Sequence, residues 1–205
     1  MDAELTGEAG SLPPLVADAT ERARAAGFPM SCEPEVGQLL AALAAHLPPG
    51  ARVLELGTGA GVGTAWLASG LLPRMDVVVL TVEASADTAA LAARGDWPAF
   101  VELRCGDALA ELDAEAQAGT GSFDLIFADS PAGKTRGLDR VIAALAPRGL
   151  LVVDDMAPLP EWPEQLRASQ QRVRAALLGS PVLTSVELAH GSGVILATKT
   201  ARASG

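Results

Sequence analysis

Acidic residues that could bind a metal ion stand at the ends of short apolar runs in this sequence. Asp129 follows the run Phe123–Ala128, and Asp154 and Asp155 close a run that begins at Leu150. If these runs are neighbouring parallel strands, their carboxyl ends meet at one edge of a sheet. Three carboxylates brought together repel one another unless a proton or a cation intervenes. Asp129, Asp154 and Asp155 are therefore candidate ligands for Mg²⁺ or a similar hard divalent cation.

Lys134 is a candidate base close to this cluster, five residues after Asp129. Lys134 and Lys199 are the only lysines among the 15 Lys and Arg residues of the chain. A compact ammonium group shifts its pKa readily when buried and can then take a hydroxyl proton, which a guanidinium cannot readily do. Because the chain has no tyrosine, we predict that Lys134 and Asp129 are catalytic. The alternative is a solvated lysine at the start of a helix.

A glycine-rich loop gives a second candidate site after the apolar run Arg52–Leu56. Glycines at such a turn let the backbone approach a ligand, and the next helix offers unpaired N–H groups. The dinucleotide pattern Gly-x-Gly-x-x-Gly fails, because its third glycine falls on Val62 or Thr64. A phosphate-binding Gly-Lys-Ser/Thr is also absent from the loop. With Glu55 ahead of Gly57, Gly59 and Gly61, the loop instead resembles the S-adenosylmethionine (SAM) binding motif of methyltransferases.

Two more acidic residues follow apolar runs and could contact a nucleoside. Glu83 ends the run 77–83, where a carboxylate can accept hydrogen bonds from both ribose hydroxyls. Asp107, within Gly106-Asp107-Ala108, follows the run 100–105. Taken alone, each residue is a solvated acid or, for Asp107, a helix N-cap. Because they follow successive predicted strands, we interpret them as cofactor contacts.

The elements that must position these residues alternate in type from Ala51 onward. Short apolar runs predict buried strands, and Ala-rich stretches between them predict crossover helices, so the sheet is parallel and doubly wound. The predicted strands cover 52–56, 77–83, 100–105, 123–128 and 150–154, and the helices cover 62–71, 86–94, 108–117 and 134–145.

The two ends of the chain complete this prediction. Residues 13–26 and 35–47 predict N-terminal helices, and the last part predicts a helix over 164–178 and strands over 181–188 and 193–199. The turn between the last strands is too short for a parallel crossover, so they form an antiparallel hairpin. We predict one α/β domain over 1–205, with a helical cap over 1–50 and a Rossmann-like seven-stranded core over 51–205. This is the layout of class I SAM-dependent methyltransferases.

The sequence resembles the cation-dependent O-methyltransferases typified by the caffeoyl-CoA and catechol O-methyltransferases. The elements that carry the resemblance are Met30-Ser31, Gly37-Gln38, the Glu55 glycine loop, Phe123-Asp124-Leu125-Ile126-Phe127-Ala128-Asp129, Asp154-Asp155 and Gly191-Ser192-Gly193. The resemblance implies that Asp129, Asp154 and Asp155 hold a cation that grips adjacent acceptor oxygens, with Lys134 as base or electrostatic aid. With the motifs above, it implies SAM contacts at Met30, Ser31, Glu55, Gly57, Thr58, Gly59, Gly61, Gly63, Glu83, Gly106, Asp107, Ala108 and Asp129.

Three departures from the family pattern indicate a divergent branch. The family's Asp-x-x-Lys is extended by two residues between Asp129 and Lys134. The last metal ligand, usually Asn, is Asp155, and the Tyr-Ser of the glycine loop is replaced by Val62-Gly63.

A Pro-rich segment, 156–163, follows the acidic pair and carries Trp162, one of few large side chains in the chain. We interpret the segment as a substrate lid in which Trp162 covers the acceptor. The alternative is that Trp162 packs under the next helix.

Composition excludes several classes of function. With 25 acidic and 15 basic residues, the net charge is −10, so nucleic acid is not expected as a partner. No uncharged apolar run reaches the ~18 residues of a membrane span. The first residues, Met1-Asp2-Ala3-Glu4, are acidic where a signal peptide would be basic, so we expect none. Cys32 and Cys105 are far apart in sequence and show no ligand spacing, so they indicate neither a zinc site nor a disulfide scaffold, and we expect a reducing compartment. We predict a cytoplasmic protein with a small-molecule acceptor and, from the family resemblance, a homodimer.

The leading hypothesis is a SAM-dependent methyltransferase that acts on an oxygen of a small molecule. Metal-independent methylation of nitrogen or a carboxyl group is an alternative, with the acidic cluster serving orientation only. A SAM-binding protein without transferase activity is another, and a nicotinamide dehydrogenase is a distant third because of the glycine spacing.

Overall fold

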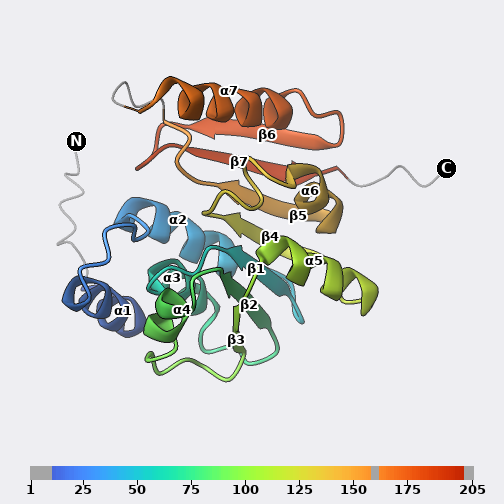
Figure 1. Ribbon diagram of the computed structural model, residues 1–205. Coiled ribbons are helices and arrows are strands. Elements are labelled where there is room, and N and C mark those ends of the chain that lie inside the picture. Colours follow the sequence, from blue (N-terminus) through green and yellow to red (C-terminus); the bar gives the residue numbers. More distant parts are fainter. Residues whose placement is uncertain (1–10, 158–161, 201–205) are drawn as a thin grey trace, which may run out of the picture.

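A seven-stranded sheet forms the centre of the computed structural model, which describes residues 11–157 and 162–200 (Figure 1). The strand order is β3-β2-β1-β4-β5-β7-β6. The first five strands pair in parallel, and β7 is antiparallel to both β5 and β6. The strands are β1 (Arg52–Leu56), β2 (Val78–Glu83), β3 (Val101–Cys105), β4 (Phe123–Ala128), β5 (Leu145–Val153), β6 (Leu183–Leu188) and β7 (Val194–Lys199). The predicted doubly wound sheet with a final antiparallel hairpin is therefore confirmed.

Helices cover both faces of the sheet. The helices are α1 (Pro14–Ala25), α2 (Pro34–Ala45), α3 (Val62–Leu71), α4 (Ala86–Ala92), α5 (Ala108–Gln117), α6 (Leu138–Ala144) and α7 (Glu164–Leu178). Buried residues of α1 to α3 form one apolar cluster with Val53 of β1, whereas those of α5 to α7 cluster with Leu54 and Leu56. Alternate β1 side chains thus face opposite layers, as a buried strand requires. None of the described helices is long and apolar enough to cross a membrane.

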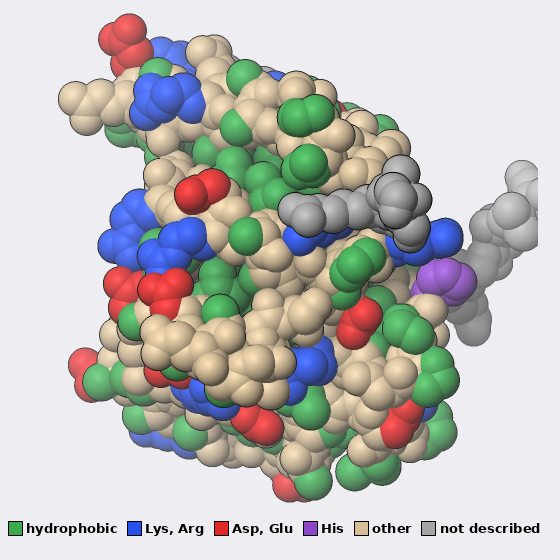
Figure 2. Space-filling model, turned by 90° about the vertical axis from the view of Figure 1, so that its right-hand side faces the viewer, with side chains coloured by type: hydrophobic (Ala, Val, Ile, Leu, Met, Phe, Trp, Pro, Cys, Tyr) green, Lys and Arg blue, Asp and Glu red, His purple; other side chains and the backbone are tan. Residues whose placement is uncertain are grey.

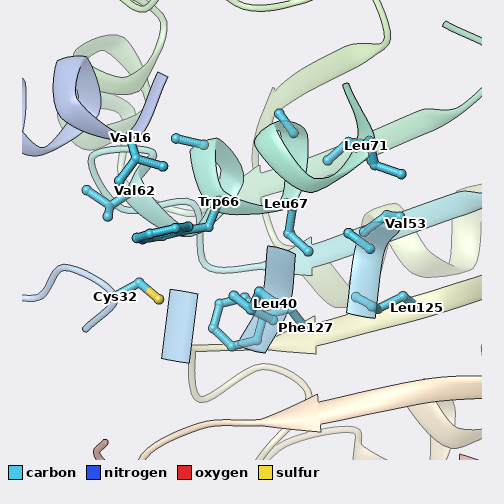
Figure 3. Close-up of a cluster of buried hydrophobic side chains, with 14 of the residues drawn as sticks. Val16, Cys32, Leu40, Val53, Val62, Trp66, Leu67, Leu71, Leu125 and Phe127 are labelled. Atoms are coloured by element: carbon cyan, nitrogen blue, oxygen red, sulfur yellow. The ribbon is translucent and has the colours of Figure 1, made fainter. Parts of the chain in front are cut away.

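Helices α2 and α3 pack closely because glycines lie at their contact. A Cβ atom at Gly37 would lie 2.1 Å from the Trp66 ring, and one at Gly70 would lie 2.2 Å from the Ala41 carbonyl oxygen. Trp66 lies in the cluster of buried side chains that also includes Leu40 (Figure 3). The Gly37-Gln38 element of the sequence therefore has a packing role that holds α3, and with it the glycine loop, against the N-terminal helices.

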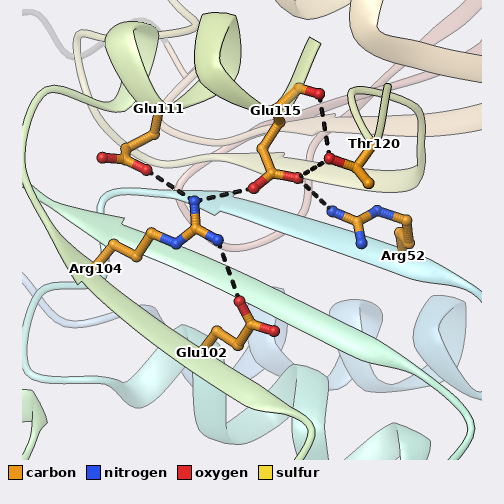
Figure 4. A network of polar contacts seen from close by, with 6 residues as sticks. All are labelled: Arg52, Glu102, Arg104, Glu111, Glu115 and Thr120. Carbon is orange, nitrogen blue, oxygen red and sulfur yellow. Dashed lines mark hydrogen bonds and ion pairs between the residues drawn. The ribbon is translucent and has the colours of Figure 1, made fainter. Parts of the chain in front are cut away.

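Hydrogen bonds and ion pairs connect α5 to β1 and β3 (Figure 4). Glu115 accepts hydrogen bonds from Arg52 and from the Thr120 hydroxyl, each at 2.7 Å, and pairs with Arg104 at 2.9 Å. Arg104 also pairs with Glu111 of α5 at 2.9 Å.

On the face of the molecule in Figure 2, basic side chains lie among acidic and apolar ones.

Two predicted boundaries near the candidate site are wrong. Helix α6 begins at Leu138 rather than at Lys134, because Gly133 and Gly137 adopt left-handed φ angles of +87° and +68° and form a loop. Strand β5 begins at Leu145 rather than at Leu150, with a register shift in its pairing to β4.

Candidate functional site

Two cavities adjoin at the carboxyl ends of the parallel strands. The first, of about 530 Å³, is lined by the glycine loop and the ends of β2 and β3, and we call it the glycine-loop cavity. The second, of about 600 Å³, is lined by the acidic cluster and α7, and we call it the carboxylate cavity. Both volumes suit small-molecule ligands. The residues that line both cavities are Met30, Ser31, Cys32, Asp129, Ser130 and Pro131.

The glycine loop turns so tightly that several of its positions exclude a side chain. Gly57 has a φ of +107°, and a Cβ there would lie 2.7 Å from the Asp129 carbonyl oxygen. Gly61, the N-cap of α3, has a φ of +92°. Gly63 is helical, yet a Cβ on it would overlap a carboxylate oxygen of Glu55. The glycines therefore bring the backbone close to β4 and over Glu55.

Glu55 lies under the loop and is 1% exposed. Its Oε2 accepts hydrogen bonds from the hydroxyls of Thr64 and of Thr81, the latter at 2.6 Å, because Thr81 is its partner in the β1–β2 register. Its Oε1 has no hydrogen-bond partner among the described residues. Burial raises the pKa of Glu55 to about 8, despite the opposing effect of the two hydroxyls. Glu55 lines the glycine-loop cavity, and its unpaired Oε1 is buried beneath Gly63 with the capacity to accept a hydrogen bond.

Glu83 and Asp107 also line this cavity. Glu83 accepts hydrogen bonds from the backbone N–H groups of Gly59 and Ser85, both at 2.9 Å, and each oxygen keeps a second lone pair for a ligand. Asp107 caps α5 through the Leu109 N–H at 2.8 Å. That bond and an ion pair with Arg136 at 3.1 Å lower the pKa of Asp107. Asp107 therefore has the capping role considered as the alternative, and it also lines the cavity.

The acidic cluster forms as the sequence predicted, with Lys134 in contact with it. Candidate ligand atoms of Asp129, Asp154 and Asp155 all lie within 4.8 Å of one another. Lys134 Nζ lies 2.9 Å from an Asp155 oxygen and 3.4 Å from an Asp129 oxygen, and its side chain is 11% exposed. The longer connection between Asp129 and Lys134 thus still returns the ammonium to the cluster, so Lys134 is not a solvated surface lysine.

Burial and mutual repulsion raise the pKa values of Asp129 and Asp154. Burial, with the charges of Asp154 and Asp155, raises the pKa of Asp129 to about 7, although Lys134 opposes this shift. Burial also raises the pKa of Asp154, against hydrogen bonds from Ser192 and from the Asp155 N–H. Such a cluster is stabilised by any added positive charge.

The residues of the cluster fit a hard divalent cation. Three carboxylates supply the oxygen ligands that such an ion prefers. With the Lys134 ammonium included, the formal charge is −2, which one divalent ion balances.

The predicted site residues lie around these two cavities. Every predicted SAM contact except Gly61 lines the glycine-loop cavity. Trp162 lines the carboxylate cavity with Lys134 and the three aspartates. Of the predicted lid, residues 158–161 lie outside the described residues.

Sequence reasoning missed residues that hold the acidic pair in place. The Ser192 hydroxyl donates to Asp154, and the Gln170 amide donates to the carbonyl of Asp155, whose φ is +58°. Arg174 donates to the carbonyl of Met156. These groups come from α7 and the β6–β7 turn. The Gly191-Ser192-Gly193 element marks the turn as part of the family resemblance, but no pattern indicates the roles of Ser192, Gln170 and Arg174.

The N-terminal helix supplies another missed contact. Arg22 of α1 donates to the Ala60 carbonyl of the glycine loop at 3.2 Å, and its guanidinium lies 5.5 Å from the centre of the Trp97 ring. A Cβ on Gly61 would lie 2.8 Å from that ring. Arg22 and Trp97 therefore fix the outer side of the loop.

Comparisons with known proteins agree with this geometry. A relative from Mycobacterium sp. (strain JLS), provisionally named an O-methyltransferase, is 34% identical over 146 residues, which cover 68% of this chain and 63% of the relative. The catechol O-methyltransferase of Niastella koreensis is 36% identical over 117 residues, which cover 55% and 52% respectively. The chain thus spans less than two thirds of the length of these relatives.

A solved structure matches over nearly the whole chain. The O-methyltransferase TomG from Streptomyces achromogenes, in complex with SAM, superposes with a TM-score of 0.76 at 26% identity. The match covers 93% of this chain and 91% of TomG. Residues 54–156, from the glycine loop through the acidic pair, match a family described as a methyltransferase domain. The resemblance to class I O-methyltransferases is thereby confirmed, and the chain belongs to the methyltransferase domain family.

Proposed function

We propose that this chain transfers the methyl group of SAM to a hydroxyl oxygen of a small molecule. The observation that carries the proposal is the pair of adjoining cavities, one built on the glycine loop and the other on Lys134 and three carboxylates. Asp129 lines both, so it stands between a bound cofactor and a bound acceptor. The SAM complex of TomG, with the same fold, supports SAM as the ligand of the first cavity.

In this proposal, residues on the glycine-loop side orient the cofactor. Glu83 accepts hydrogen bonds from the ribose hydroxyls through its free lone pairs, and the unpaired oxygen of Glu55 accepts one at the methionine end. Met30 and Ser31 close the side next to the acceptor. SAM supplies an activated methyl group on a sulfonium, so the protein mainly has to align the reactants and remove a proton.

Asp129 and Lys134 handle the acceptor hydroxyl. As the oxygen forms its bond to the methyl carbon and the carbon–sulfur bond breaks, Asp129 accepts the hydroxyl proton. Without a bound cation, burial raises the pKa of Asp129 to about 7, which suits a base that works near neutral pH. The Lys134 ammonium stabilises the negative charge that develops on the oxygen. The products are the methyl ether and S-adenosylhomocysteine (SAH).

We also propose that Asp129, Asp154 and Asp155 hold a divalent cation. Such an ion would bind adjacent acceptor oxygens and lower the pKa of the reacting hydroxyl. The carboxylate geometry and the catechol O-methyltransferase relative support this step. Adding EDTA to an active preparation tests it: loss of turnover that Mg²⁺ restores is expected. Unchanged turnover contradicts the cation and favours metal-independent methylation, in which the carboxylates only orient the acceptor.

Calorimetry with SAM and SAH tests the cofactor. We expect both to bind, and absence of binding by either would contradict the proposed function. A mass-shift screen against catechols, hydroxybenzoates and amines then distinguishes an enzyme from a binding protein, because only an enzyme yields products heavier by one methylene. The family resemblance further leads us to propose a single-domain homodimer, which light scattering tests.

A further inference from the structure

The loop between β4 and α6 sends side chains into both cavities. Lys134 lines the carboxylate cavity, whereas Arg136, two residues later, lines the glycine-loop cavity. This loop is the segment that is two residues longer than the family pattern. The same loop therefore carries two cations that line two different cavities.

Hydrogen bonds make the segment 131–136 a compact turn. The Gly133 N–H donates to the Arg136 carbonyl at 2.8 Å, and the Arg136 N–H donates to the Pro131 carbonyl at 3.0 Å. Ala132 and Arg136 also form an isolated β-bridge. Lys134 lies inside this turn, so these backbone hydrogen bonds link its position to that of Arg136.

Arg136 pairs with Asp107, and both residues line the glycine-loop cavity. Its guanidinium lies 3.1 Å from an Asp107 oxygen, and both side chains are more than half exposed. An exposed ion pair contributes little to folding stability. A planar guanidinium in a cavity wall can, however, stack on the aromatic ring of a ligand. A ligand that fills this cavity would contact both members of the pair.

We propose that Arg136 is a positioning residue that couples the two cavities. The adenosyl part of the bound cofactor packs against Arg136 and Asp107, and the turn 131–136 then holds Lys134 at Asp129 and Asp155. Cofactor binding thus fixes the group that handles the acceptor hydroxyl. This inference rests on the proposed function and deepens it by naming how the cofactor prepares the acceptor site.

The scarcity of lysine allows a direct test. Protein labelled with ¹³C at the lysine ε-carbon gives signals from Lys134 and Lys199 only, and a Lys134→Arg variant assigns them. Titration with SAH is expected to shift the Lys134 signal and not that of Lys199, which donates to the carbonyls of Ala143 and Leu145. In Arg136→Ala saturated with SAH, the shift at Lys134 is expected to be lost. An equal shift in the variant would overturn the inference.

The Kd of SAH and the melting temperature together distinguish a positioning role of Arg136 from a role in folding. Arg136→Ala is expected to raise the Kd of SAH about threefold to tenfold with an unchanged melting temperature. The matched control is Arg140→Ala, because Arg140 also joins α6 to α5, through Asp113 and the Leu109 carbonyl, but lines neither cavity. This control is expected to leave the Kd unchanged. An equal weakening in both variants would mean a structural role and overturn the inference.

Kinetics with an acceptor from the screen give a second readout. At saturating SAM, Arg136→Ala is expected to lower kcat in the wild-type background and to have no further effect on kcat in Lys134→Ala. If the double variant instead loses kcat by the product of the two single-variant factors, Arg136 does not act through Lys134. If the wild type binds no SAH, the proposed function itself fails, and this inference fails with it. If the wild type binds SAH and Arg136→Ala behaves like the wild type, only this inference fails.

Discussion

At the scale of single residues, Glu55 combines an ionisable group with a buried position. Its two threonine donors engage one oxygen, and the other faces Gly63 without a partner among the described residues. Burial therefore outweighs the hydrogen bonds and raises its pKa from 4.5 to about 8. A ligand that donates a hydrogen bond to this oxygen would favour the ionised form.

This raised pKa makes stability depend on pH in a defined direction. Between about pH 4.5 and pH 8, the folded state holds a proton on Glu55 that the unfolded state has released, so the free energy of unfolding falls as pH rises. The slope from this group is at most about 1.4 kcal/mol per pH unit. In Glu55→Gln this slope is absent. Urea denaturation of both proteins at several pH values in this range measures the difference, and parallel curves would contradict the assignment.

The sequence predicts the positions of the acidic residues and glycines well where they follow strands. Asp129, Asp154, Glu83 and the glycines lie at strand ends, which the apolar runs mark, and parallel pairing brings those ends together. Supporting groups from distant segments could not be predicted. Ser192 reaches Asp154 only because the β6–β7 turn folds back beside the end of β5, where Met156 N–H donates to the Gly193 carbonyl.

At the scale of elements, the contact between α2 and α3 depends on the absence of a side chain at Gly37. Glycine in a helix interior costs about 1 kcal/mol relative to alanine. Here the cost is offset because a Cβ would overlap Trp66. The sequence alone shows the glycine but not its neighbour, since Trp66 lies 29 residues away.

Gly37→Ala is therefore expected to destabilise the protein by about 1–3 kcal/mol, because the Trp66 ring must move. Chemical denaturation measures the change. Gln38→Ala on the exposed side of the same helix is the control, with an expected change within about 0.5 kcal/mol. A stabilised Gly37→Ala variant would show that helix propensity outweighs packing here.

Glu115 has a comparable role for α5. Burial tends to raise its pKa, but hydrogen bonds from Thr120 and Arg104 outweigh burial and lower it. Glu115→Ala leaves Arg52 and Arg104 without a buried partner (Figure 4), so we expect a loss of about 2–3 kcal/mol at neutral pH. Its contribution is present above the unfolded-state pKa and fades as pH falls.

Thermal or urea denaturation at neutral and acidic pH measures this loss. Glu102→Ala removes a carboxylate that also pairs with Arg104, at 3.3 Å, but is about half exposed. Its effect is expected to stay within about 0.5 kcal/mol. Equal losses in the two variants would contradict a special role for Glu115.

Most element boundaries follow from the apolar pattern, and the exceptions have local causes. The helix predicted over 134–145 contains Gly137, which takes a left-handed φ and acts as the N-cap of α6. The stretch Pro147-Arg148-Gly149 reads as a turn, yet it lies inside β5, with Arg148 at a φ of +69°. Such irregular backbone depends on the neighbouring strand, which a single sequence does not reveal.

At the scale of the whole molecule, negative charge affects which acceptors can approach the carboxylate cavity. The chain carries a net charge of −10. The carboxylate cavity is lined by Glu33, Asp129, Asp154 and Asp155, and among the described lining residues only Lys134 is basic. Because Lys134 is already paired with two of these acids, no free cation of the described lining faces an incoming anion.

The proposed cation would balance only the three aspartates and Lys134, so Glu33 and the net charge of −10 would still repel an anion. We therefore expect an anionic acceptor to react more slowly at low ionic strength than a neutral one, by about tenfold in kcat/KM. Added salt screens the repulsion and should raise the rate for 3,4-dihydroxybenzoate while leaving that for catechol unchanged. Initial rates at several salt concentrations measure this. A rate for the anion that falls with salt would show attraction instead.

The boundary shared by the two cavities also bears on inhibitor chemistry. Met30, Ser31, Cys32, Asp129, Ser130 and Pro131 border both spaces, so ligands in the two cavities would lie next to each other. Two weakly binding fragments joined across this boundary would bind as one molecule, because the second fragment arrives at a high effective concentration. The adjoining cavities thus make the protein a natural target for bisubstrate ligands, whose selectivity would come from the less common acceptor half.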